Sequence, residues 1–444
     1  MFSHPDEASA DQRAREARSL AETHPASEIA IVQSQNPSGY SKGAELGLSI
    51  LGAIFAERVH LIGQKLEDAE RALHQASKMA RSHIVHERGA AGDLESGLEG
   101  ALKSSSIVFL LEPDEATLER AASSLSDESL VFVDPGEGTL EACLDKAPSL
   151  KSRVIGLRLF GPPHLTTGAE LLRTSELDET RFTLGAAVLS ARFGLLAVEV
   201  SDRPLGLARR LEAKLLNEAA KLAEAYPAHH INAALGAETG RPKGALALLD
   251  AIGWENHRRR ANLLSEESGD ARLRAPSFMS GGDGERSFLK KGDAGELLAL
   301  DLPSGRYLAA PSGDDEELKV YRAMSALIEV GEYEEALETL MNASGALPKL
   351  TRELLAAHLV DAFGAVGDGV ASLAELDRLV GAALGWIPPG ALVDLIGLER
   401  SKELITEAGL GVPPILSDRS DGERLHHDPR LSPGSYLGAY LMAR

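Results

Sequence analysis

The chain has 444 residues, more than one ordinary hydrophobic core accommodates, and this length predicts about two to four domains. Hydrophobic residues make up 43% and charged residues 25%, which is typical of a globular protein and excludes a disordered chain. The formal net charge of -21 disfavours nucleic acid and anionic membrane surfaces as partners, because both require clustered cations.

Cysteine and histidine usage limits the metal chemistry that the sequence predicts. The single cysteine, Cys143, excludes an intramolecular disulfide and a cysteine-based zinc site. The histidines are scattered, and we expect the adjacent pairs His229/His230 and His426/His427 to point in different directions. Since no recognisable ligand spacing is present, we predict no metal site.

The N-terminal segment and the longest apolar run bear on the location of the protein. The first 24 residues are polar and charged and lack an apolar segment, which argues against a secretory signal. The run "LGLSILGAIFA" is too short to span a bilayer and has helical periodicity. The sequence therefore predicts a cytoplasmic protein that does not bind a membrane.

Short apolar runs alternate with helical stretches from Ile29 to about residue 202. In chain order they read "IAIV", "KGAELGLSILGAIFAE", "VHLIG", "LEDAERALHQASKMARSHIVHER", "SIVFLL", "EATLERAASSL", "LVFVDP", "LEACLDKA", "RVIGLRLFGPP" and "LLAVEVSD". Each crossover between parallel strands needs a covering element, so this alternation indicates a parallel sheet wrapped by helices. We predict a doubly wound α/β domain here.

The rest of the chain is predicted to be mainly helical. Leucines and alanines at i, i+3 and i+4 spacing in "RRLEAKLLNEAAKLAEAY" indicate an amphipathic helix. A region rich in Gly, Ser and Asp follows, and "GELLALDLPSGRYLAAP" within it predicts a hairpin with a Pro-Ser-Gly turn. The predicted divisions are a polar segment at 1–24, an α/β domain at 25–202, a first helical domain at 203–265, a linker with the hairpin at 266–315, a second helical domain at 316–415 and a tail at 416–444.

An internal repeat relates the two helical domains. The segments "LNEAAKLAEAYPAHHINAALG" and "GALALLDAIGW" are echoed by "LVDAFGAVGDGVASLAELDRLVGAALGW" and "GALVDLIGL". In each copy an aspartate precedes a glycine by three residues: Asp250 and Gly253 in the first copy, Asp394 and Gly397 in the second. Two copies of one helical unit are predicted, and such copies often pack as a pseudo-symmetric pair.

The order of these segments resembles a known family. An α/β domain, then "DRP" leading into a helix with "LNEA", then "GRPK" and "LLDAIG", is similar to the 3-hydroxyacyl-CoA dehydrogenases of fatty-acid β-oxidation, in particular the long bacterial form with two C-terminal helical domains. The similarity covers about residues 28 to 415. It implies a Rossmann-like, NAD-binding-type domain followed by two all-α C-terminal-type domains. No residues remain for the enoyl-CoA hydratase domain of the multifunctional members.

The resemblance assigns a catalytic position to the strand "VIGLRLFGPP". The family reads "VGMHFFNPP" where this chain reads "IGLRLFGPP", so Arg158 stands at the place of the general-base histidine. Imidazole accepts the proton of the substrate hydroxyl near pH 7, whereas arginine takes up no proton at that pH. The glutamate that orients the histidine is retained, twelve residues further on, as Glu170. The resemblance therefore implies an ion pair between Arg158 and Glu170.

Other catalytic positions of the family are also changed. The substrate-side asparagine of "PGFxxNR" aligns with Arg209 in "PLGLARR", and the serine after "TNTS" aligns with Gly136 in "VDPGEG". The usual glutamate of "VxEAVPE" aligns with Leu110, and a lysine on the CoA side is replaced by Glu119. The resemblance thus implies loss of several groups that contact the substrate.

The cofactor-binding pattern of a dinucleotide fold is missing as well. Such a fold needs glycines between the first strand and helix, so that the pyrophosphate approaches the helix N-terminus. This chain has "QSQNP" at residues 33–37 instead, and only Ser38, Gly39 and Ser41 offer a weak phosphate site. The second strand ends in Gly63 and Gln64, where an acid that binds the ribose is expected.

Three functional hypotheses follow from these observations. The first, which we favour, is a non-catalytic relative that keeps the fold for binding or assembly and needs no cofactor. The second is an active dehydrogenase that uses NAD. The third is an enzyme with altered chemistry that uses Glu170, Arg158 and His164. The partners to consider are an acyl-CoA, another β-oxidation enzyme, or a second copy of the chain.

Overall fold

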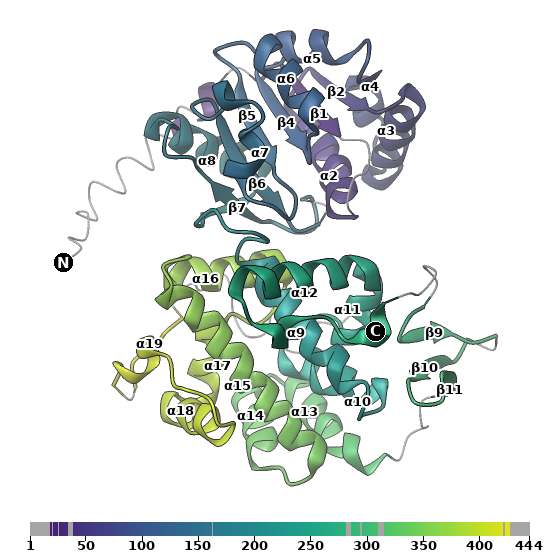
Figure 1. Cartoon of the computed structure of the whole chain (residues 1–444), viewed down its shortest axis with the longest axis vertical. Coiled ribbons are helices and arrows are strands. Elements are labelled where there is room, and N and C mark those ends of the chain that lie inside the picture. Colours follow the sequence, from purple (N-terminus) through teal and green to yellow (C-terminus); the bar gives the residue numbers. More distant parts are fainter. Residues whose placement is uncertain are drawn as a thin grey trace. The chain divides into compact units, whose positions relative to one another are not determined.

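The computed structural model describes residues 18–426, except residues 20, 25, 34–38, 162, 281–285, 294, 310–314 and 421. The chain forms two compact units, Met1–Gly206 and Leu207–Arg444. The first is an α/β unit and the second is mainly helical (Figure 1).

The described part of the first unit contains an eight-stranded sheet with the strand order β3-β2-β1-β4-β5-β6-β7-β8. The strands are β1 (Glu28–Gln33), β2 (Arg58–Gly63), β3 (Gly89–Asp93), β4 (Ile107–Leu111), β5 (Leu130–Asp134), β6 (Val154–Leu159), β7 (Gly168–Leu172) and β8 (Leu196–Glu199). All neighbouring strands are parallel except β6 and β7. The predicted Rossmann-like, doubly wound fold is confirmed, with β7 and β8 running opposite to the other strands.

Helices cover both faces of this sheet. They are α2 (Gly39–Phe55), α3 (Leu66–Ala80), α4 (Ile84–Arg88), α5 (Leu98–Ser104), α6 (Glu115–Ser124), α7 (Leu140–Leu144) and α8 (Glu179–Phe193). Leu48 of α2, Ala69 of α3 and Val188 of α8 share one buried apolar cluster with the strands. On the opposite face, the short helix α7 packs close to β6, since a Cβ at Gly156 would lie 2.9 Å from Leu140 Cδ2. Arg158, which the resemblance places at the family's catalytic position, lies in β6 between these two helical layers.

The second unit consists of two helical groups and a small sheet. The first group contains α9 (Ala208–Leu222), α10 (Ala228–Ala234), α11 (Ala245–Ile252) and α12 (Trp254–Ser268). The small sheet contains β9 (Leu289–Lys291), β10 (Leu297–Asp301) and β11 (Arg306–Ala309), paired antiparallel. The second group contains α13 (Lys319–Glu329), α14 (Tyr333–Asn342), α15 (Ala346–Gly367), α16 (Leu373–Leu379), α17 (Pro389–Ile396), α18 (Leu398–Glu407) and α19 (Pro414–Ser417).

The internal repeat is visible in matching backbone geometry. Gly253, between α11 and α12, has φ 90° and ψ 138°, and Gly397, between α17 and α18, has φ 92° and ψ 139°. These positive φ values favour glycine, which explains its recurrence at both joints. The two copies also contact each other, because Ile387 N donates to the carbonyl oxygen of Gly240 at 2.7 Å and Arg241 lies over the Trp386 ring.

None of the described helices is by itself long and apolar enough to cross a bilayer. The segments Leu373–Leu384 and Pro389–Ile396, bent by 103°, meet the length and composition test only when taken together. Both are rich in buried residues within the second unit, as core helices are.

Candidate functional site

Arg158 and Glu170 face each other across the two antiparallel strands β6 and β7. Side chains alternate along a strand, and Ile155, Leu157 and Leu159 of β6 point into the apolar cluster under α2 and α8. Arg158 therefore points to the opposite face, as Glu170 does from β7. Both side chains are completely buried, and Arg158 Nη1 lies 3.7 Å from Glu170 Oε2.

Backbone carbonyl groups surround the guanidinium of Arg158. Its Nε donates to the carbonyl oxygen of Gly136 at 3.3 Å, and its Nη2 donates to those of Gly138 and Arg203 at 2.5 and 3.1 Å. These acceptors come from the turn after β5 and from the segment after β8. A buried charge is tolerated only when it is paired and hydrogen-bonded, and Arg158 satisfies both conditions.

The segment that ends the first unit is closely fitted to this ion pair. A Cβ on Gly206 would lie 1.8 Å from Glu170 Oε2, so a larger residue does not fit there. Gly206 has φ +63° and the preceding Leu205 has φ +64°, which is an uncommon conformation for leucine. Leu205 N donates to the carbonyl oxygen of Glu137, which holds the segment against the turn after β5.

Asp202 fixes the same segment from its other end. Its carboxylate accepts hydrogen bonds from Leu140 N and Glu141 N at 2.8 and 2.9 Å. These N–H groups belong to the first turn of α7, where carboxylates commonly cap a helix. The "DRP" motif therefore anchors the end of the first unit to α7.

Gly136 lies in a tight turn directly after β5. Its N–H donates to Asp134 Oδ1 at 2.8 Å, and its φ of +68° favours glycine. Glu112, which also has a positive φ of 48°, donates its N–H to the carbonyl oxygen of Asp134. This turn presents the Gly136 carbonyl oxygen to Arg158, so the position implied for a substrate-binding serine contributes a carbonyl group to the ion-pair site.

The remaining predicted catalytic residue belongs to the second unit. Arg209 lies in the first turn of α9, and its side chain is 1% exposed. The structure thus brings Arg158, Glu170 and Gly136 together in the first unit, and Arg209 belongs to the second unit.

Part of the predicted phosphate site lies outside the described residues. Ser38 is not described, and Gly39 and Ser41 lie in the first turn of α2. Further along α2, a Cβ on Gly47 would lie 2.2 Å from Pro163 Cδ, so this glycine serves the close packing of α2 against the segment after β6.

The ribose end of a dinucleotide site does not fit the described residues. The strand β2 ends at Gly63, and the next residue, Gln64, is exposed. The first acidic residue after β2 is Glu67, already in the first turn of α3. A carboxylate at the end of β2 is what binds the ribose of NAD, so this part of the cofactor site is absent from the described strand end.

His164, the third residue of the altered-chemistry hypothesis, follows β6 in a turn. Burial lowers its pKa, which favours neutral imidazole. Among the described residues, no hydrogen-bond partner contacts its Nδ1. A general base needs a group that orients its ring, and no described residue does so here.

The sheet topology and the helical second unit define the class of fold to which this chain is similar. A Rossmann-like sheet with the order 3-2-1-4-5-6, two added strands that run opposite to the others, and a helical second unit together make up the fold of 3-hydroxyacyl-CoA dehydrogenases. The resemblance predicted from the sequence is thereby confirmed for the fold. No family model matches the chain.

Three solved structures illustrate this likeness. The 3-hydroxybutyryl-CoA dehydrogenase from Escherichia coli has a TM-score of 0.61 at 16% identity, covering 89% of this chain and 98% of its own. The dehydrogenase part of multifunctional enzyme 1 from C. elegans has a TM-score of 0.53 at 12% identity, covering 92% and 97%. The (S)-3-hydroxybutyryl-CoA dehydrogenase from Ralstonia eutropha has a TM-score of 0.50 at 18% identity, covering 65% and 100%.

Sequence reasoning missed several residues of the site. Gly206 and Arg203 contact the ion pair, yet nothing in "DRPLGL" marks them as its neighbours. The sequence does contain a turn signal, because Leu205 and Gly206 directly follow Pro204 and a glycine close to a proline indicates a turn. Their contact with Glu170 and Arg158 depends on the tertiary fold.

Proposed function

We propose that this chain is a catalytically inactive relative of the 3-hydroxyacyl-CoA dehydrogenases that serves fatty-acid β-oxidation as a binding or assembly subunit. The observation that carries the proposal is the buried Arg158, paired with Glu170 and bonded to three carbonyl groups. By the resemblance, this is the position of the family's general base. The chain keeps the scaffold around that position and lacks the group that accepts the proton.

The chemistry of arginine supports this proposal directly. The guanidinium remains protonated throughout the physiological pH range, so Arg158 takes no proton from a substrate hydroxyl. Its fork of N–H donors is directed at Gly136, Gly138 and Arg203, which hold it inside the first unit. A substrate that reached this place would meet a fixed cation in place of a base.

The cofactor end supports the same proposal. A hydride transfer to NAD needs a bound nicotinamide, and the described end of β2 carries no carboxylate for the ribose. An inactive subunit needs neither the base nor the cofactor. An active enzyme needs both, and would have to supply them from other residues.

The test is a direct assay of the purified chain. Acetoacetyl-CoA and NADH are mixed with the protein while the absorbance of NADH is followed, and NADH binding is measured by calorimetry. We expect no turnover above that of buffer and no saturable NADH binding. Clear turnover by the unmodified chain would overturn the proposal, whereas saturable NADH binding without turnover would change the subunit's role to that of a cofactor sensor.

The variant Arg158→His provides the matched control for the assay. It restores the family's residue beside Glu170 but leaves Gly136 and the end of β2 unchanged. We expect it to remain inactive, because the substrate and cofactor positions are still altered. Turnover in this variant alone would mean that the cofactor and substrate sites persist and that inactivity depends on Arg158 only.

The assembly role needs a separate measurement. The chain is mixed with purified enoyl-CoA hydratase, thiolase or an active 3-hydroxyacyl-CoA dehydrogenase and analysed by size-exclusion chromatography with light scattering. A defined complex with one of these enzymes is expected. A chain that stays alone with each of them, yet binds an acyl-CoA in calorimetry, would be a ligand-binding protein and not an assembly subunit.

A further inference from the structure

Two adjacent histidines in the second unit converge on one carboxylate. His229 and His230 lie in the first turn of α10, and Asp315 precedes the short helical turn that leads into α13. His230 Nε2 lies 2.6 Å from Asp315 Oδ2, and His229 Nε2 lies 3.6 Å from the same oxygen. One potential ligand atom from each of the three residues falls within 4.8 Å of the others.

The sequence predicts that the adjacent His229 and His230 point in different directions, and the structure shows that this prediction is wrong. Adjacent residues normally point apart, but the two imidazole rings here are 4.4 Å apart between centroids, at 66° to each other. Both Nε2 atoms lie within 3.6 Å of Asp315 Oδ2. The convergence depends on a carboxylate that is distant in sequence, which the spacing of the histidines alone does not reveal.

Asp315 is oriented for this contact by its own backbone environment. Its Oδ1 accepts a hydrogen bond from Glu317 N at 3.0 Å, which leaves Oδ2 directed at the histidines. All three side chains are mostly buried, with 14 to 16% exposure. A metal ligand needs this kind of fixed rotamer, because ordering a free side chain costs binding energy.

The protonation states also suit a cation. The hydrogen bond with His230 lowers the pKa of Asp315, so its carboxylate is ionised at neutral pH. Burial and the neighbouring His230 lower the pKa of His229, so its ring is neutral there. Neutral imidazole and ionised carboxylate are the forms that bind transition metals.

We propose that His229, His230 and Asp315 form a binding site for a divalent transition metal of the Zn²⁺ class. Around a tetrahedral Zn²⁺ with bonds of about 2.0 to 2.1 Å, neighbouring ligand atoms lie about 3.3 Å apart. The two separations on Asp315, 2.6 and 3.6 Å, lie on either side of this value. Two imidazoles and one carboxylate are an established ligand set for zinc.

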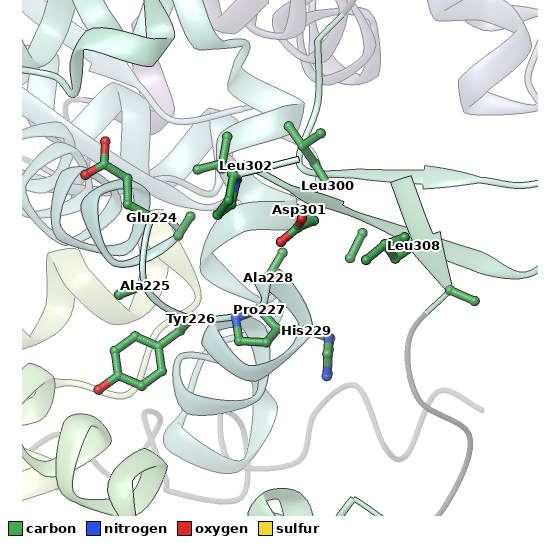
Figure 2. A pocket seen from close by; sticks show the side chains of 14 residues that line it. Glu224, Ala225, Tyr226, Pro227, Ala228, His229, Leu300, Asp301, Leu302 and Leu308 are labelled. Carbon is green, nitrogen blue, oxygen red and sulfur yellow. The ribbon is translucent and has the colours of Figure 1, made fainter. Parts of the chain in front are cut away.

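One of the three residues, His229, also lines a cavity. His229 lines a cavity of about 350 Å³ between the start of α10 and the hairpin of β10 and β11. Figure 2 shows His229 among the lining side chains, together with Tyr226 from the same segment and Asp301 and Leu308 from the hairpin. Zinc sites with three protein ligands typically keep a water molecule as the fourth ligand.

The same contacts also tie separate parts of the second unit together. His229 and His230 belong to the first helical group, whereas Asp315 begins the second. A metal bound by all three residues would join the two groups at this point. Metal binding would then also raise the stability of the second unit, since it acts on the folded chain only.

The test uses the full, tag-free chain after treatment with a chelator. Zn²⁺ is titrated by calorimetry, and the metal content is measured after desalting. We expect one Zn²⁺ per chain and a higher melting temperature with Zn²⁺ present. Co²⁺ added in its place is expected to give the visible absorption bands of a four- or five-coordinate nitrogen and oxygen site.

Three variants and one control test which side chains bind the Zn²⁺ ion. His229→Ala, His230→Ala and Asp315→Asn are each expected to weaken Zn²⁺ binding by about 100-fold or more. The control is His74→Ala, which removes an exposed histidine from α3 in the first unit and is expected to change nothing. Asp315→Asn keeps the shape of the side chain, so it remains informative if an alanine variant fails to fold.

Two outcomes would overturn the proposal. In the first, the unmodified chain binds less than one Zn²⁺ and its melting temperature does not change. The contacts would then be only a hydrogen-bonded cap at the start of α13. In the second, folded variants of His229, His230 and Asp315 keep the affinity of the unmodified chain, which would assign the ion to other residues. Neither outcome depends on whether the chain is an active dehydrogenase.

Discussion

Asp250 and Asp394 bind the backbone in the same way at matching positions of the two helical copies. Asp250 in α11 accepts hydrogen bonds from the consecutive N–H groups of Phe288 and Leu289, at 2.8 and 2.9 Å. Asp394 in α17 accepts them from Leu425 and His426, at 2.8 and 3.0 Å. Each aspartate thus attaches a later segment of the chain to its own helical copy.

We predict that Asp394→Asn and Asp250→Asn each lower the free energy of unfolding by about 2 kcal/mol. In each aspartate, Oδ1 accepts one of the two N–H groups and Oδ2 accepts the other. Asparagine has an NH₂ group in place of one of these oxygens, so one of the two hydrogen bonds is lost. Urea denaturation followed by circular dichroism measures the loss. The exposed Glu335→Gln in α14 is the control, and equal stability of all three variants would contradict the assigned role.

The pair of Arg158 and Glu170 gives a second prediction. Replacing Arg158 by Met leaves the buried Glu170 carboxylate without the cation opposite it, and we expect a loss of about 3 to 5 kcal/mol of stability. Adding Glu170→Leu removes the buried charge as well and should recover much of that loss. A double-mutant cycle by denaturation measures the coupling. Additive effects of the two substitutions would mean that the coupling free energy between Arg158 and Glu170 is zero.

A comparison of Gly206 with Gly194 separates the cost of a steric clash from the cost of a positive φ. Gly206→Ala introduces a Cβ into the space of Glu170 Oε2 at a φ of +63°. Gly194 has a similar φ of +66°, but a Cβ there meets nothing within 4 Å. We expect Gly194→Ala to cost about 1 kcal/mol from its positive φ alone, and Gly206→Ala to cost clearly more. Equal costs in thermal denaturation would mean that Glu170 moves aside freely.

The sequence allowed prediction of the parts of the fold that depend on local patterns. The apolar runs that became β1, β2, β4, β5 and β6 were recognised because each is a short, continuous apolar segment between helical stretches. The strand β7 was not, because its five residues contain Glu170 at the centre and carry no strand pattern. Its pairing with β6, which places Glu170 opposite Arg158, appears only in the folded chain.

The site was predictable only where the resemblance supplied a position. The pairing of Arg158 with Glu170 followed from the place of both residues in the family's pattern, and the register of β6 and β7 brings them together. The cluster of His229, His230 and Asp315 had no such pattern. Asp315 lies in a region without periodicity, and only the folded chain brings it to α10.

Glu45 in α2 gives a prediction for the pH dependence of stability. The side chain is 5% exposed, and burial, followed by the charge of Asp68, raises its pKa from 4.5 to about 7, while Lys42 acts in the opposite direction. The folded state therefore holds this proton more tightly than the unfolded state. The resulting stability is present below pH 4.5 and is lost as the pH rises to about 7.

We predict that Glu45→Gln removes this pH dependence. The variant should match the unmodified chain near pH 4.5 and exceed it at pH 8 by about 3 kcal/mol, because the shift of the pKa converts to that free energy. Urea denaturation at a series of pH values measures both curves. Glu119→Gln, at an exposed position of α6, is the control and should leave the slope unchanged. The prediction is wrong if the stability of Glu45→Gln falls with pH as steeply as that of the unmodified chain. Equal slopes would mean that folding does not raise the pKa of Glu45.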